Sequence, residues 1–140
     1  MDKPILCPSA PANWQGSQLL GVMVGSVDKP EMAYLPKLEL ITNELLEAVR
    51  PCQPEEVMRF TAPCANEQCA HFSNSQTRCQ LAEKVVHYMP IASEKLPACH
   101  IRRDCRWYVQ EGKASCLRCS QIVTHNLNAN EVLRKVTNID

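Results

Sequence analysis

Four cysteines between residues 99 and 119 constrain this chain more than any other feature. They are Cys99, Cys105, Cys116 and Cys119. Because only two residues separate Cys116 from Cys119, a single turn of backbone can direct both sulfur atoms at one centre. The chain holds nine cysteines in 140 residues, and their clustering is not typical of cysteines that only fill a core. The stretch therefore predicts a site that binds a metal ion or an iron–sulfur cluster.

An earlier stretch looks like a degenerate copy of this one. Cys64 aligns with Cys99, Cys69 with Cys105, Cys79 with Cys116, and Ala82 with Cys119. The earlier stretch therefore supplies three thiols and needs a fourth, either Cys7 or Cys52. We favour Cys7, because Pro8 follows it as proline follows a ligating cysteine in bacterial ferredoxins, and Cys52 stays the alternative. Eight cysteines then form two four-thiolate sites.

Other uses of the cysteines explain the pattern less well. Structural disulfides need an oxidising compartment, and the first eight residues lack the apolar segment of a signal peptide. We therefore expect a cytoplasmic protein with reduced thiols. A thioredoxin-like pair follows a strand early in a βαβ unit, whereas Cys116 and Cys119 lie late in the chain. Catalysis by His100 with Cys99 is disfavoured, because sequence neighbours seldom align for proton transfer.

The spacing favours iron–sulfur clusters over zinc. Structural zinc sites usually draw their ligands as two close pairs, and each set here has at most one such pair. The gaps are four and nine residues in the first stretch and five and ten in the second, which suits ligands around a larger inorganic core. We expect two clusters of the four-iron type, with the two-iron form and zinc as alternatives.

Charge bears on the partners of the chain. Fifteen basic residues balance fifteen acidic ones, so neither a nucleic acid nor an anionic membrane is predicted as a partner. No apolar run approaches the roughly 20 residues of a membrane span. Around the later cysteines, basic residues outnumber Asp104 and Glu111; they are Arg102, Arg103, Arg106, Lys113 and Arg118. Positive charge favours the reduced cluster, so the later site should have the higher reduction potential.

The patterning predicts an α+β fold in a single domain, in which a small N-terminal strand region (1–50) precedes a helical, loop-rich metal lobe (51–124) and a tail (125–140). Strands are predicted over 19–27 and 32–35, and helices over 42–49, 54–60, 79–88 and 101–110. A last helix ends at Arg134, with Asn128 or Asn130 as its cap. The glycines of the first strand indicate close packing or a bulge.

The two cysteine stretches, the Cys7-Pro8 start and the segment Gly21–Gly25 resemble a family of small, uncharacterised, cysteine-rich bacterial proteins. Members occur in cyanobacteria and actinobacteria and look like iron–sulfur proteins. In a photosynthetic source, the resemblance implies a role near photosystem assembly or its electron carriers. This chain departs from the family pattern at Ser120, where proline is expected, and in having Cys52.

These observations predict a function in electron transfer or redox sensing. The chain would serve a protein redox partner or a larger complex, as a carrier, an accessory protein or an assembly factor. An enzyme is less expected, because no acid–base pair or substrate pocket can be identified in the sequence. The competing hypothesis is an interaction module in which zinc stabilises the fold without redox activity.

Overall fold

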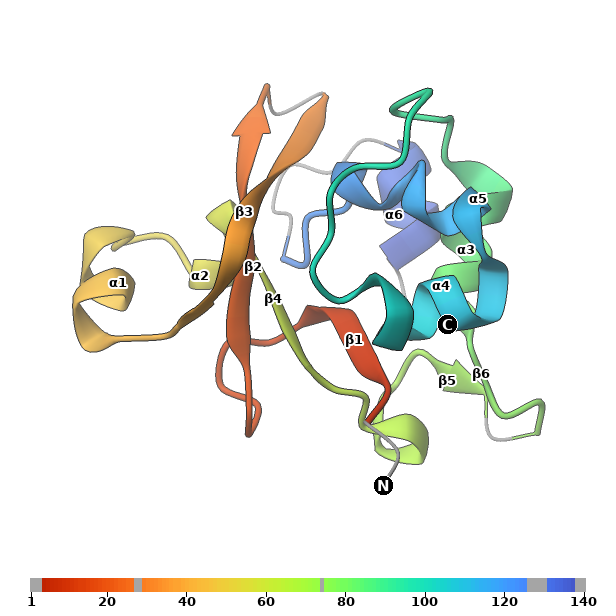
Figure 1. The fold of residues 1–140 in the computed structure, drawn as a ribbon, viewed down its shortest axis with the longest axis horizontal. Helices are drawn as coiled ribbons and strands as arrows, with labels where there is room; N and C mark the ends of the chain where they lie inside the picture. The colour runs from red at the N-terminus through yellow and green to blue at the C-terminus, as the bar shows by residue number, and fades with distance from the viewer. Residues whose placement is uncertain (1–3, 27–28, 74, 126–130, 138–140) are drawn as a thin grey trace.

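A four-stranded antiparallel sheet forms the centre of the fold in the computed structural model (Figure 1), which describes residues 4–26, 29–73, 75–125 and 131–137. Its strands follow the order β1-β4-β2-β3. Their bounds are Leu6–Ala10 for β1, Gln18–Gly25 for β2, Pro30–Leu40 for β3 and Met58–Pro63 for β4. A separate two-stranded sheet pairs β5 (Phe72–Ser73) with β6 (Arg78–Cys79).

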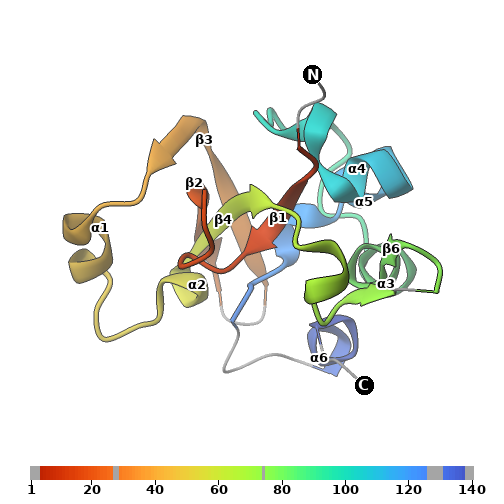
Figure 2. The same cartoon turned by 90° about the horizontal axis from the view of Figure 1, so that it is seen from below.

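Short helices lie on both sides of the central sheet (Figures 1 and 2). The α-helices are α1 (Asn43–Ala48), α2 (Pro54–Val57), α3 (Gln80–Tyr88), α4 (Arg106–Glu111), α5 (Lys113–Cys116) and α6 (Glu131–Thr137). The 3₁₀ turns are η1 (Asn66–Gln68), η2 (Arg102–Asp104) and η3 (Cys119–Gln121). The expected α+β class is confirmed.

The two faces of the sheet bury different clusters, because successive side chains of a strand alternate between faces. On one face, Leu19 and Phe60 pack with partly buried residues of α1 and α2. On the other, Leu20 and Met32 join the larger cluster formed with α3 and with Trp107 of α4. This second cluster includes Cys79, Cys105 and Cys119.

Several predicted elements are confirmed. The helix predicted over 42–49 is α1, whose Thr42 side chain accepts a hydrogen bond from Leu45 N at 3.1 Å. The helix predicted over 79–88 is α3, and the strands over 19–27 and 32–35 lie in β2 and β3. The predicted helix over 101–110 is divided into η2 and α4 at Cys105. Val27, Asn128 and Asn130 lie outside the described residues.

The helix predicted over 54–60 was wrong in its second half. It ends at Val57, and Met58 begins β4. The first five residues of β4 are all buried, because this inner strand is covered on both faces. Its hydrogen bonding to β1 and β2 outweighs the helical start that Pro54 and its following acids favour.

Gly21 lies where β2 shifts register against both β3 and β4. A Cβ at this position would stand 2.7 Å from Ala33 O and from the Met32 side chain. The glycine therefore serves close packing at a bulge, as predicted.

The Gly21→Ala substitution should destabilise the chain by about 1–3 kcal/mol, because the added methyl group overpacks a backbone contact that cannot move away. Chemical denaturation of the metal-free chain would measure the loss. The neighbouring Val22, which is 37% exposed, is the control, and Val22→Ala should cost about 0.5 kcal/mol. Equal losses at the two positions would contradict this packing argument.

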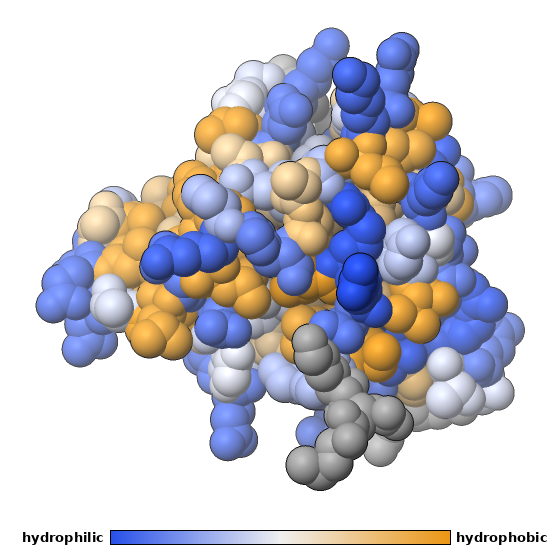
Figure 3. Space-filling view, viewed as in Figure 1, coloured by the Kyte–Doolittle hydropathy of each residue, from blue (hydrophilic) through white to orange (hydrophobic). Residues whose placement is uncertain are grey.

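The surface mixes polar and apolar side chains (Figure 3), with an apolar area over α1 and the end of β3. Leu40, at the end of β3, is 74% exposed. Within the described residues, no helix is both long and apolar enough to cross a bilayer.

Candidate functional site

The first set of thiols lines one cavity. Its walls include Cys7, Cys64, Cys69 and Cys79, and its volume is about 230 Å³. Cys7 lies in β1, while the other three follow β4 and belong to the loop and short hairpin before α3. Cys64 N donates a 2.8 Å hydrogen bond to Ile5 O, which fixes the loop beside β1. Residues far apart in sequence therefore meet at this cavity.

Local hydrogen bonds position the remaining two thiols of this set. Turn η1 closes through Cys69 N, which donates to Asn66 O at 2.9 Å. The Gln110 side chain pairs with both backbone groups of Cys79: Cys79 N donates to Oε1 at 2.8 Å, and Nε2 donates to Cys79 O at 2.9 Å. Because Gln110 belongs to α4, the first set is tied to the helix that lies between Cys105 and Cys116 of the second set.

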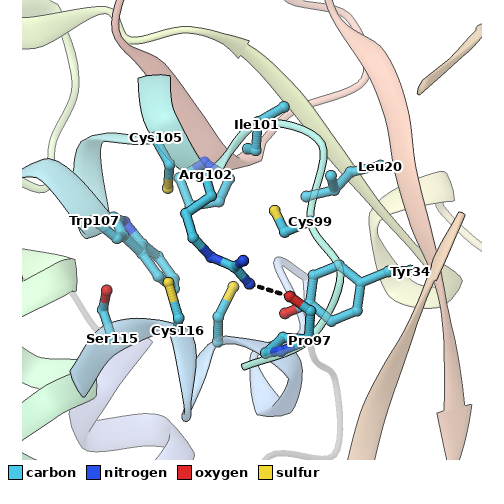
Figure 4. Close-up of a pocket in the computed structure, with 12 residues that line it drawn as sticks. Leu20, Tyr34, Pro97, Cys99, Ile101, Arg102, Cys105, Trp107, Ser115 and Cys116 are labelled. Atoms are coloured by element: carbon cyan, nitrogen blue, oxygen red, sulfur yellow. Dashed lines mark hydrogen bonds between the residues drawn. The ribbon is translucent and has the colours of Figure 1, made fainter. Parts of the chain in front are cut away.

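The second set of thiols lines another cavity, shown in Figure 4. Its walls include Cys99, Cys105, Cys116 and Cys119. The Arg102 side chain extends between the labelled sulfur atoms and donates a hydrogen bond to Pro97 O (Figure 4). Only about 20 Å³ remains open in this cavity, into which the Arg102 side chain extends. Arg102 Nε is buried without a partner among the described residues.

The two sets share a local structure that supports their alignment as copies. In each, a 3₁₀ turn precedes the second cysteine, whose N–H closes that turn: Cys69 N donates to Asn66 O, and Cys105 N donates to Arg102 O at 3.2 Å. The copies differ after this point. Cys105 is the N-cap of α4, whereas Cys69 leads into the β5–β6 hairpin.

Arg59 is the residue that sequence patterning missed. It is fully buried in β4, and its guanidinium donates to Pro8 O, Cys119 O and Ile122 O at 2.8–3.0 Å. Nη2 also lies 3.2 Å from Cys119 Sγ. No carboxylate hydrogen-bonds to it in the part of the chain that the structure describes. Since a buried cation needs a compensating anion, the sulfur atom is the group placed to supply it.

Burial dominates the ionisation of these groups. It raises the pKa of Cys7 to about 12, assisted by repulsion from the three other thiols of its set. Burial likewise raises the pKa of Cys79, Cys99 and Cys105, and in each case other cysteines of the same set contribute. For Arg59, burial lowers the pKa, but Cys119, Tyr34 and Cys7 outweigh it and the net shift is upward. Arg59 thus interacts electrostatically with both sets.

The metal-free chain should lose stability as the pH rises above 9. The pKa of the Cys7 thiol increases from 9.0 to about 12 on folding, so the folded chain holds this proton more tightly. The resulting stabilisation is fully present below the unfolded pKa and is lost as the pH rises through the folded value. Denaturation midpoints under reducing conditions across this window would measure the slope. The Cys7→Ser chain should show a shallower slope, and identical slopes would contradict the assignment.

The remaining candidates lie apart from the two sets or add little to them. Cys52, the alternative fourth ligand, is exposed and lines neither cavity, and all nine cysteines are free thiols. His71 lines the first cavity, where burial lowers its pKa. As the side chains stand, no three His, Cys, Asp or Glu residues within the described ranges are placed to hold a metal ion.

Comparison with known proteins finds no matching family model, no similar curated protein and no similar solved structure. The resemblance to cyanobacterial and actinobacterial cysteine-rich proteins therefore stays a prediction. The function must be argued from the two sets of thiols themselves.

Proposed function

We propose that this chain is an iron–sulfur protein that binds two clusters through four cysteines each and acts in electron transfer or redox sensing. The first centre comprises Cys7, Cys64, Cys69 and Cys79, and the second comprises Cys99, Cys105, Cys116 and Cys119. The observation that carries the proposal is the division of eight free thiols between two cavities, with the ninth exposed.

The size of the first cavity supports a cluster over a single ion. A volume of about 230 Å³ is far more than one metal ion with four sulfur ligands requires, since a water molecule needs only about 10–15 Å³ by the same measure. Four-iron clusters fit ligands that converge from several directions. Binding would draw the thiols inward and release their protons.

The buried charge of Arg59 supports an anionic second centre. A four-iron cluster with four thiolates carries a formal charge of about −2 when oxidised, and Arg59 reaches Cys119 Sγ directly. Arg102 and the other basic residues near this centre would add to the compensation. A zinc centre with four thiolates has the same formal charge, so charge supports metal ligation in general, and the preference for a cluster rests on the volume of the first cavity.

Anaerobic reconstitution with iron and sulfide, in competition with zinc, tests the proposal. We expect about eight iron and eight sulfide per chain and broad visible absorption that dithionite bleaches. A colourless chain that retains zinc and excludes iron would instead support the zinc-stabilised interaction module. A chain that binds neither metal would refute both.

Removing the Arg102 side chain should speed cluster formation at the second centre, because the guanidinium occupies the space between the thiols. The rate at which visible absorbance increases would be compared in a Cys7→Ser background, so that only the second centre contributes to the absorbance. We expect Arg102→Ala to load several-fold faster than its parent. The neighbouring Arg103 is exposed, and Arg103→Ala should leave the rate unchanged. Equal rates in both variants would show that Arg102 does not control access.

A further inference from the structure

The two centres adjoin through the backbone. Leu6, which immediately precedes Cys7, forms a parallel β-bridge with Cys105. Cys7 lines the first cavity and Cys105 lines the second. Cys7 of the first centre therefore directly follows Leu6, whose backbone pairs with Cys105 of the second centre.

Arg59 connects the same two regions through its side chain. Nη2 donates to Pro8 O at 2.8 Å and to Cys119 Sγ at 3.2 Å. Because one nitrogen makes both contacts, Pro8 O lies within about 6 Å of Cys119 Sγ. Pro8 is bonded directly to Cys7, so a single buried guanidinium spans the short distance between the two ligand sets.

Trp107 forms a wall that both cavities share. It lines each of them and is 1% exposed, and the Arg59 guanidinium carbon lies 5.8 Å from the centre of its ring. Its Nε1 is buried and has no hydrogen-bond partner among the described residues. Since a buried indole N–H usually has an acceptor, this donor is available to an acceptor atom bound in a cavity.

We propose that the two centres form an intramolecular electron relay, in which one electron passes from the first centre to the second across the wall of Trp107 and Arg59. This inference rests on the proposed function. The reduced first centre loses one electron, and the oxidised second centre gains it. No covalent bond forms or breaks, and no proton is transferred. The first centre is reduced by a low-potential one-electron donor protein, and the second is reoxidised by a one-electron acceptor protein.

The direction follows from the placement of positive charge. Arg59 contacts a sulfur atom of the second centre, whereas towards the first centre it reaches only the carbonyl oxygen of Pro8. Arg102 extends into the second cavity (Figure 4). Hydrogen bonds and positive charge at a cluster stabilise its reduced form. An electron shared between the centres should therefore reside mainly on the second.

Electron paramagnetic resonance of the reconstituted chain tests the relay. When both centres are reduced with a strong chemical reductant, dipolar interaction between adjacent spins should split or broaden the signals. The Cys7→Ser and Cys99→Ser chains, which each retain one centre, should give simple spectra. If the fully reduced chain gives only the sum of these spectra, the relay is refuted while the proposed function stands. If the chain assembles no clusters, both proposals fail.

The role of Arg59 has its own readout in chains reduced by one electron. Among chains that hold both centres, we expect Arg59→Met to shift the ratio of the two signals towards the first centre by on the order of tenfold. An unchanged ratio would refute Arg59 as a positioning residue of the relay. Should that variant fail to fold, Trp107→Phe keeps a smaller aromatic ring in the wall and removes the N–H. If the signal ratio is unchanged in Trp107→Phe as well, the wall of Trp107 and Arg59 does not influence where the electron resides, and its role in the relay is refuted.

Discussion

The Cys7→Ser chain should bind about four iron and four sulfide instead of about eight of each. Serine removes one of the four thiols at the first cavity. The remaining three belong to a loop and a short hairpin, which the centre would connect to β1 through Cys7. A cluster with three cysteine ligands would be lost or greatly weakened during purification. Iron and sulfide analysis together with visible absorbance would measure the loss. Because metal binding is coupled to folding, the melting temperature should fall as well.

Cys52→Ser is the matched control for this experiment. Cys52 is exposed and lines neither cavity, so its removal should leave iron, sulfide and absorbance at their full values. Cys99→Ser should remove the second centre and keep the first. If Cys52→Ser halves the iron content while Cys7→Ser preserves it, Cys52 is the fourth ligand and the arrangement at β1 has another purpose.

The cysteine sets were the part of the site most accessible to sequence reasoning. Spacing and the internal copy group seven cysteines into two stretches, and the structure places these stretches at two cavities. The eighth position stayed open, because Cys7 and Cys64 are separated by most of the sheet in sequence. They meet only because β1 pairs with β4, and no local pattern encodes that pairing.

Two strands of the central sheet escaped detection for physical reasons. β1 contains Pro8, which cannot donate a ladder hydrogen bond and so indicates a loop. The proline is tolerated because β1 is an edge strand. β4 contains Arg59 between Met58 and Phe60, and a charged residue within an apolar segment indicates an exposed position. Its partners lie at residues 8, 119 and 122, which sequence periodicity cannot relate to it.

The roles of Arg102 and Trp107 depend on tertiary structure. The arginines of the later stretch predicted positive charge near the second centre, and they did not indicate that one side chain would extend between the thiols. Trp107 lines both cavities, because α4 directly follows Cys105 of the second set and packs beside β1 and β6.

Arg59→Ala should destabilise the metal-free chain by about 3–5 kcal/mol. The substitution leaves three buried carbonyl oxygens without their donor, those of Pro8, Cys119 and Ile122. It also leaves a void beside Trp107. This loss is a large part of the 5–15 kcal/mol that stabilises a typical domain. Urea denaturation of the metal-free and reconstituted chains would measure it, and the loss should be greater in the reconstituted chain, where the guanidinium faces an anionic centre.

Two other substitutions separate charge from hydrogen-bond geometry. Arg59→Lys keeps the positive charge but offers one nitrogen in place of the planar fork, so an intermediate loss is expected. Arg50 is largely exposed and its guanidinium lies 3.6 Å from a carboxylate oxygen of Glu47, so Arg50→Ala should cost less than about 1 kcal/mol. If the loss at Arg59 is the same with and without bound clusters, the guanidinium stabilises the backbone alone and compensates no charge at the thiols. A greater loss in the reconstituted chain would tie the buried arginine to the anionic centre, because only charge compensation depends on what the cysteines hold.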